Sequence, residues 1–136
     1  MYLLDTTIPS ELRKGLRGNL NVLQWVRRTP ADLQYISVMT ILELRLGALQ
    51  REKSDPAQAM ALHRWIDESV LTGFRGRILP VSIEAAERCA ALHIPTMRDD
   101  RDMLIASTAL VHQFTVVTRN VRHFEPTGVP ILNPWH

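Results

Sequence analysis

Met1-Tyr2-Leu3-Leu4-Asp5-Thr6-Thr7-Ile8-Pro9 opens the chain with a short apolar run that ends in an acid. Such a run, bounded by polar residues, is typical of a buried strand. Pro9 follows a few residues later, and proline is well placed in the first turn of a helix. We therefore predict a strand over residues 2–4, Asp5 directly after its carboxyl end, and a helix that begins near Pro9.

Short apolar runs and longer helical segments alternate along the rest of the chain. Further strands are expected at residues 35–38, 78–81, 115–118 and 131–132. Helices are expected at residues 19–28, 40–52, 55–71, 82–93 and 99–112. This alternation predicts an α/β fold, with a mainly parallel central sheet flanked by helices. The 136 residues contain no linker-like or repeated segment, so we expect a single domain over residues 1–136.

The composition is that of an ordinary globular protein, with 46% hydrophobic residues and a net charge of +2. Among the 16 basic residues, only Lys14 and Lys53 are lysines. Arginine suits phosphate because its planar fork binds two oxygens at once. A net charge this small is nevertheless far from the basic surface of a dedicated nucleic-acid-binding protein. We therefore interpret the arginine content as a reflection of genomic base composition.

Cysteine usage and the apolar segments bear on where the protein resides. Cys89 is the single cysteine, so no intrachain disulfide can form. The first residues lack the basic start and the long apolar stretch of a signal peptide. The longest uncharged stretch, residues 103–118, is too short and too polar to span a bilayer. We expect a cytoplasmic protein that has no membrane partner.

Polar side chains gather at the predicted ligand-binding edge of the sheet. In parallel α/β sheets, ligands bind beyond the carboxyl ends of the strands. Asp5 and Asn120 each follow a predicted strand, and Asp102 stands in the first turn of a helix. Each also has a purely structural interpretation. Asp and Asn are good helix and turn caps, and the three acids between residues 99 and 102 complement a helix dipole.

Glu43 is a fourth candidate. Its neighbours on a helix face are Met39, Leu46 and Gly47, so its carboxylate lies beside apolar side chains, where a charge needs a partner or a cation. The structural alternative is a capping box, in which Thr40 caps a helix and Glu43 lies three residues later. Both interpretations remain open from the residues alone.

Together these positions place three carboxylates and an amide at one edge of the sheet. The five histidines lack the paired spacing of metal ligands, so no nitrogen or sulfur ligand set accompanies the acids. Carboxylates alone suit a hard, oxygen-loving ion such as Mg²⁺ or Mn²⁺. Such an ion activates water and shields the transition state of phosphodiester cleavage.

Four blocks of sequence resemble the signature blocks of PIN-domain toxins of the VapC type, and they occur in the same order. A further block resembles the usual end of such chains. The five blocks are Met1–Thr6, Ser37–Leu44, Asp102–Ala106, Thr118–Phe124 and Gly128–Trp135. The resemblance spans the whole chain. It implies a PIN-like α/β fold, cleavage of RNA with Mg²⁺ or Mn²⁺, and a cognate VapB-type antitoxin as partner.

The resemblance also implies roles for individual residues. The three acids of the family fall on Asp5, Glu43 and Asp102, which would be the metal ligands. The fourth position is often Asp in the family and is Asn120 here, so it joins the catalytic set without counting as a metal ligand. The Asn that usually lies two residues after the first acid is Thr7 here, which can still donate a hydrogen bond to Asp5.

Other classes of protein fit the residues less well. A phosphatase of the haloacid-dehalogenase type needs a second Asp at position 7, and a response-regulator receiver needs a late Lys. The remaining rival is a catalytically weak or inactive PIN-fold module that binds RNA or protein, which Asn120 favours and the three acids in register oppose. By resemblance to PIN toxins we also expect a homodimer. Trp25 and Trp65 are candidate interface residues, although the core is the expected place for each of them taken singly, because aromatic residues dominate cores as well as interfaces.

Overall fold

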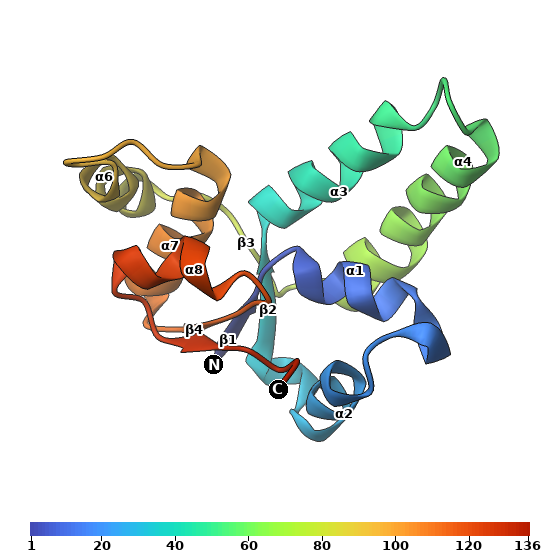
Figure 1. The fold of residues 1–136 in the computed structure, drawn as a ribbon, viewed down its shortest axis with the longest axis horizontal. Coiled ribbons are helices and arrows are strands. Elements are labelled where there is room, and N and C mark those ends of the chain that lie inside the picture. The colour runs from blue at the N-terminus through green and yellow to red at the C-terminus, as the bar shows by residue number, and fades with distance from the viewer.

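The computed structural model describes residues 1–136 and has a central sheet with helices on both faces (Figure 1). The strands are β1 (Tyr2–Leu4), β2 (Gln34–Ser37), β3 (Ile78–Leu79), β4 (Thr115–Val117) and β5 (Ile131–Leu132). The helices are α1 (Thr7–Arg13), α2 (Leu20–Arg28), α3 (Val38–Gln50), α4 (Pro56–Trp65), α5 (Leu71–Gly73), α6 (Ile83–Leu92), α7 (Asp100–His112) and α8 (Val121–Phe124). The predicted α/β architecture is confirmed.

All pairings in the sheet are parallel, and the strand order is β3-β2-β1-β4-β5. The chain therefore moves outward from β1 to β3 on one side, then returns and continues through β4 and β5 on the other. The order reverses between β1 and β4, and this switch point is where open parallel sheets form their ligand crevice. Leu4 at the end of β1 lies beside Val117 at the end of β4.

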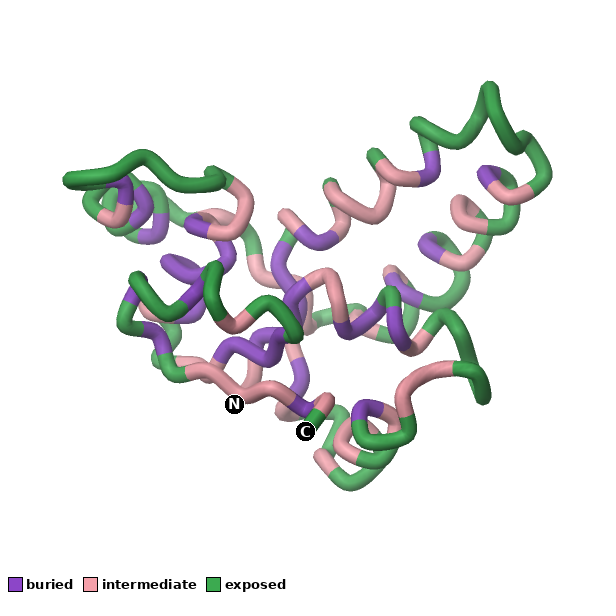
Figure 2. Tube along the Cα trace, viewed as in Figure 1, coloured by how far each residue is buried: buried purple, intermediate pink, exposed green.

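Two apolar cores cover the two faces of the sheet. Leu3 belongs to one core and Leu4 to the other, because successive side chains of a strand point to opposite faces. The first core is built with α7 and α8, the second with α1, α2 and the segment that follows α4. In Figure 2, the buried residues concentrate in the strands and the inner sides of these helices. Because a core covers β1 on each face, its sequence is an uninterrupted apolar run.

Helix α3 begins earlier than the sequence suggested. Its N-cap is Ser37, whose hydroxyl accepts a 3.0 Å hydrogen bond from the backbone N–H of Met39, and the helix begins at Val38. Thr40 is therefore a fully buried residue inside the helix, and the predicted capping box of Thr40 and Glu43 is wrong. With α4, α3 forms an antiparallel hairpin that projects from the sheet (Figure 1).

Other boundaries differ less. The helix expected over residues 55–71 is interrupted, because α4 ends at Trp65 and a π-helical turn occupies Ile66–Val70. Asp55, Ser82 and Asp99 cap the helices that follow them, as expected for N-cap side chains. No helix has both the length and the apolar character that crossing a membrane requires.

Candidate metal and active site

Asp5 lies at the switch point, directly after β1. Its Oδ1 accepts hydrogen bonds from the backbone N–H of Thr7, at 3.0 Å, and from the Thr7 hydroxyl. Its Oδ2 accepts a 2.6 Å hydrogen bond from the Thr118 hydroxyl, which follows β4. Asp5 thus bonds to the first residue of α1, whose N-cap is Thr6 rather than Asp5, and it also bridges two strands. Each carboxylate oxygen has two lone pairs, so Oδ2 keeps one free to bind a further group.

The Asp5 carboxyl is buried, with 4% of its surface exposed. This burial raises its pKa from the ordinary value of 3.8 to about 6, although the hydrogen bonds from Thr118 and Thr7 lower it; the nearby charge of Asp102 raises it further. A carboxylate held ionised in this position is unfavourable unless a cation neutralises it. The environment of Asp5 is therefore suited to a bound cation.

Glu43 reaches the same region from α3. Its Oε1 accepts a 2.7 Å hydrogen bond from the hydroxyl of Thr6, the residue next to Asp5. The Thr6 hydroxyl also lies 3.1 Å from the hydroxyl of Thr40. A hydroxyl has one proton, so when Thr6 donates to the carboxylate, Thr40 must donate to Thr6. Glu43 Oε2 lies 4.0 Å from the guanidinium of Arg101 at the start of α7.

Asp102 is placed by the first turn of α7. Its Oδ2 is 2.9 Å from Nδ1 of His123 in α8. Burial raises the pKa of the Asp102 carboxyl above its usual range, and the charge of Asp99 adds to this, while His123 and Arg101 oppose it.

The three acids around the start of α7 have separate roles. Asp99 accepts hydrogen bonds from the backbone N–H groups of Arg101 and Asp102, so it is the helix N-cap. Asp100 turns to the other side of the helix start, where its Oδ1 is 2.8 Å from Nε2 of His93. Of the three, only Asp102 is named among the charges that act on Asp5, and it is the residue that the family resemblance selected.

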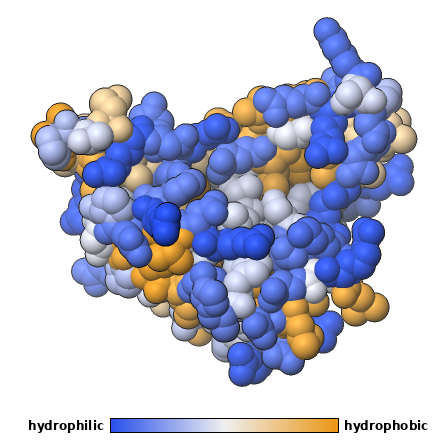
Figure 3. All heavy atoms as spheres, viewed as in Figure 1, coloured by the Kyte–Doolittle hydropathy of each residue, from blue (hydrophilic) through white to orange (hydrophobic).

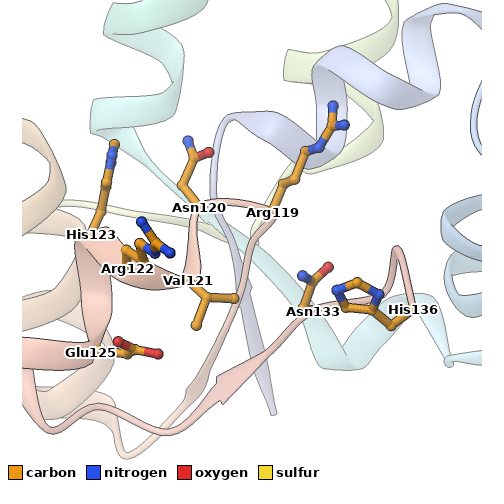
Figure 4. A pocket seen from close by; sticks show the side chains of 8 residues that line it. All are labelled: Arg119, Asn120, Val121, Arg122, His123, Glu125, Asn133 and His136. Carbon is orange, nitrogen blue, oxygen red and sulfur yellow. The ribbon is translucent and has the colours of Figure 1, made fainter.

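Asn120 stands at the N-cap position of α8, but its side chain makes no capping hydrogen bond. Its backbone N–H donates to the hydroxyl of Thr118, at 2.9 Å. In Figure 4, the side chains of Asn120 and His123 project in the same direction, away from the ribbon of the turn that carries them. The amide is therefore free to meet a ligand, and the cap interpretation of its side chain is not supported by a contact.

The structure links the predicted residues into one neighbourhood. Asp5 and Glu43 are joined through Thr6, the charge of Asp102 acts on Asp5, and Asn120 is tied to Asp5 through Thr118. No three His, Cys, Asp or Glu side chains are arranged to hold an ion by themselves. The metal site therefore stays a prediction. The oxygen-only donor set fits Mg²⁺ or Mn²⁺, because Mg²⁺ keeps several waters and needs only one or two carboxylates as direct ligands.

Sequence reasoning missed several partners of these acids. Thr6 and Thr118 hold the carboxylates of Glu43 and Asp5. The spacing of the histidines gives no sign of a role for His123, yet its Nδ1 lies 2.9 Å from Oδ2 of Asp102, between α8 and α7. The available signal was position: Thr6 adjoins the first acid, and Thr118 and His123 flank Asn120 within one block.

A five-stranded parallel sheet with acids at its switch point is the architecture of PIN domains. The PIN domain family matches residues 2–128, and the chain belongs to this family.

Full-length relatives narrow the class further. The chain is 33% identical to the VapC ribonuclease Y4jK of Sinorhizobium fredii, covering 99% of this chain and 98% of that protein. It is 33% identical to Toxin FitB of Neisseria gonorrhoeae, in a match that covers 100% of this chain and 99% of that protein. The crystal structure of FitAcB from Neisseria gonorrhoeae superposes with a TM-score of 0.88, covering 100% of this chain and 99% of that one. The crystal structure of DNA-bound VapBC from Salmonella typhimurium superposes with a TM-score of 0.72 at 26% sequence identity, covering 99% of this chain and 98% of that one. The resemblance to VapC-type toxins is confirmed.

Proposed function

We propose that this protein is the toxin of a type II toxin–antitoxin pair, and that it hydrolyses RNA phosphodiester bonds with Mg²⁺ or Mn²⁺. The observation that carries the proposal is the buried Asp5 carboxyl between β1 and β4, fixed on both oxygens by threonines and close to Glu43 and Asp102. The names of the full-length relatives, a VapC ribonuclease and a toxin, support the same function.

Asp5, Glu43 and Asp102 would hold the metal ion, directly or through its waters. When bound, such an ion lowers the pKa of a coordinated water and neutralises charge that develops on the phosphate. The chain itself supplies orientation. Thr118 and Thr7 fix Asp5, Thr6 fixes Glu43, and the exposed amide of Asn120 donates a hydrogen bond to the phosphate or to the attacking water.

The rival proposal, an inactive binding module, explains these side chains poorly. A buried carboxyl whose pKa is raised to about 6 lowers the stability of the fold at neutral pH when no cation is present. A protein that only bound RNA or a partner would gain from an uncharged residue at position 5. The loss of stability at neutral pH is explained if Asp5 is needed for metal binding.

We also propose a VapB-type antitoxin and a second copy of the chain as protein partners, in the cytoplasm where RNA is available. Solved neighbours are complexes such as FitAcB and VapBC. Helix α3 has an apolar surface suited to a partner. Four side chains spaced three or four residues apart, each 37–51% exposed, form this α3 stripe: Val38, Leu42, Leu46 and Leu49. Trp25 and Trp65 pack against the second core instead, so they contribute mainly to the fold.

Two experiments test this proposal. Purified full-length protein should cleave single-stranded RNA when Mg²⁺ or Mn²⁺ is added and should stop when EDTA is added. Absence of cleavage under all these conditions, by protein shown to be folded, would favour the binding module. For assembly, light scattering of the protein alone and with its antitoxin should show a dimer and a larger complex. A Leu46→Glu substitution in the α3 stripe should weaken either the dimer or the complex with the antitoxin.

A further inference from the structure

A wide hollow on the surface lies beside the three acids of the site, and Asn120 is among its lining residues. It has a volume of about 600 Å³ and is formed by the turn after β4, helix α8 and the C-terminal residues (Figure 4). Its basic side chains are Arg119, Arg122, His123 and His136, and its one acidic side chain is Glu125. Figure 3 shows hydrophilic side chains over much of this face, with hydrophobic ones among them. The hollow is therefore an open, basic surface, unlike the acidic site beside it.

A second hollow, of about 310 Å³, lies next to this surface and is formed by the start of α7 and by α8. Its acidic lining residues are Asp99 and Asp102, and its arginines are Arg98 and Arg122. Arg122 and His123 line both hollows. The two hollows are therefore adjacent, and the surface that they line together leads from Asp102, past Arg122, to Arg119. We call it the basic groove.

The arginines of the basic groove are available to a ligand. Both Arg119 and Arg122 are exposed, and neither forms an ion pair or a side-chain hydrogen bond within the protein. The guanidinium of Arg119 stacks over the ring of Trp135, 5.5 Å from its centroid. By contrast, Arg45 is engaged by Asp67 and Arg77 by backbone carbonyls. An oriented, unpaired guanidinium suits an incoming phosphate, because it presents two donors side by side.

We propose that the basic groove is the path of single-stranded RNA on one side of the cleaved bond, with Arg122 and Arg119 contacting phosphates that follow the one at the acidic site. The inference rests on the proposed function, since it takes RNA as the ligand. The adjacency to Asp102 carries it: a strand whose phosphate lies at the acids must leave the site across some neighbouring surface, and this one is open and carries two unpaired arginines.

The test is the salt dependence of RNA binding by the full-length protein in EDTA, where no cleavage is expected. For single strands, each phosphate contact contributes about 0.7 to the slope of log affinity against log salt. Arg122→Gln should lower the slope by about 0.7, and the double variant Arg119→Gln/Arg122→Gln by about 1.4. Arg88→Gln is the matched control, because Arg88 is exposed and unpaired on α6, outside the groove. It should leave the slope unchanged.

Equal slopes for the wild type, the control and the double variant would overturn the inference. So would arginine-dependent binding of an acidic peptide with no arginine-dependent binding of RNA, since the groove would then be a protein-docking surface. The outcome is separable from that of the proposed function. If RNA binding depends on the arginines but the protein cleaves no RNA, the RNA path along the basic groove is supported and the ribonuclease activity is refuted. If the protein cleaves RNA but the variants leave the salt slope unchanged, the ribonuclease activity is supported and the RNA path is refuted.

Discussion

The Thr118 hydroxyl donates a 2.6 Å hydrogen bond to Oδ2 of Asp5, between residues that are 113 positions apart in the sequence. The same hydroxyl accepts the backbone N–H of Asn120, at 2.9 Å. One buried side chain therefore fixes the first acid at the end of β1 and the turn after β4 that carries the fourth site residue. This bond therefore joins the carboxyl ends of β1 and β4 at the candidate active site.

Thr118→Val removes that donor while keeping the shape of the side chain. We expect metal affinity or cleavage rate to fall by roughly ten- to a hundredfold, the usual effect of losing a group that orients a metal ligand. The measurement is a titration of Mn²⁺ against cleavage rate. Thr118→Ser, which keeps the hydroxyl, should retain most of the activity; equal loss in both variants would point to packing rather than to the hydrogen bond.

Asp5→Asn should stabilise the metal-free protein at neutral pH. The pKa of the Asp5 carboxyl is about 6 in the fold and 3.8 in its ordinary state, so the native state binds the proton more tightly than the unfolded state does. Wild-type stability then falls as pH rises from about 3.8 to about 6 and stays lower above that. Asp5→Asn should lack this decline and gain about 1 to 3 kcal/mol at pH 7. Urea unfolding in EDTA at several pH values measures both; a destabilised variant would contradict the account.

Thr40→Val tests the hydroxyl chain that leads from Thr40 through Thr6 to Glu43. Loss of the Thr40 donor should let Thr6 reorient, and cleavage should fall by roughly tenfold. Thr108→Val is the matched control, because Thr108 is also fully buried in a helix but donates to the carbonyl of Leu104. The two variants should lose similar stability, and only Thr40→Val should lose activity. Thr40→Ser should restore it.

Asn120→Asp adds a carboxylate at the fourth position. It should raise divalent-ion affinity and lower the Mn²⁺ concentration needed for half-maximal cleavage, because another negative charge joins the cluster. Asn120→Ala should reduce cleavage less than Asp5→Asn does. If Asn120→Asp leaves the metal dependence unchanged, residue 120 acts only as part of the turn after β4.

The sequence predicted the features that depend on local pattern. The buried run before Asp5 and the starts of the helices at Asp55 and Ser82 all follow from neighbouring residues. The parallel sheet follows from the alternation of elements. These features suffice to bring Asp5 and Asn120 to the carboxyl edge of the sheet.

The contacts between distant segments were not predictable in the same way. The bonds from Thr6 to Glu43 and from Thr118 to Asp5 exist because β2 and β4 both flank β1, and no local pattern specifies that order. The start of α3 was misplaced for a related reason. Ser37 and Thr40 are both acceptable caps, and in the fold Ser37 caps the helix while Thr40 lies inside it, with its hydroxyl 3.1 Å from that of Thr6.

The most direct test of the central claim compares RNA cleavage by the wild type, Asp5→Asn and Asp102→Asn in saturating Mn²⁺. Each protein is first shown to be folded by circular dichroism and thermal unfolding. The account predicts cleavage by the wild type, its loss in EDTA, and loss of activity in both variants, since an amide supplies neither the charge nor the same coordination. Cleavage that persists in a folded Asp5→Asn or Asp102→Asn protein would contradict the assignment of these acids to the active site.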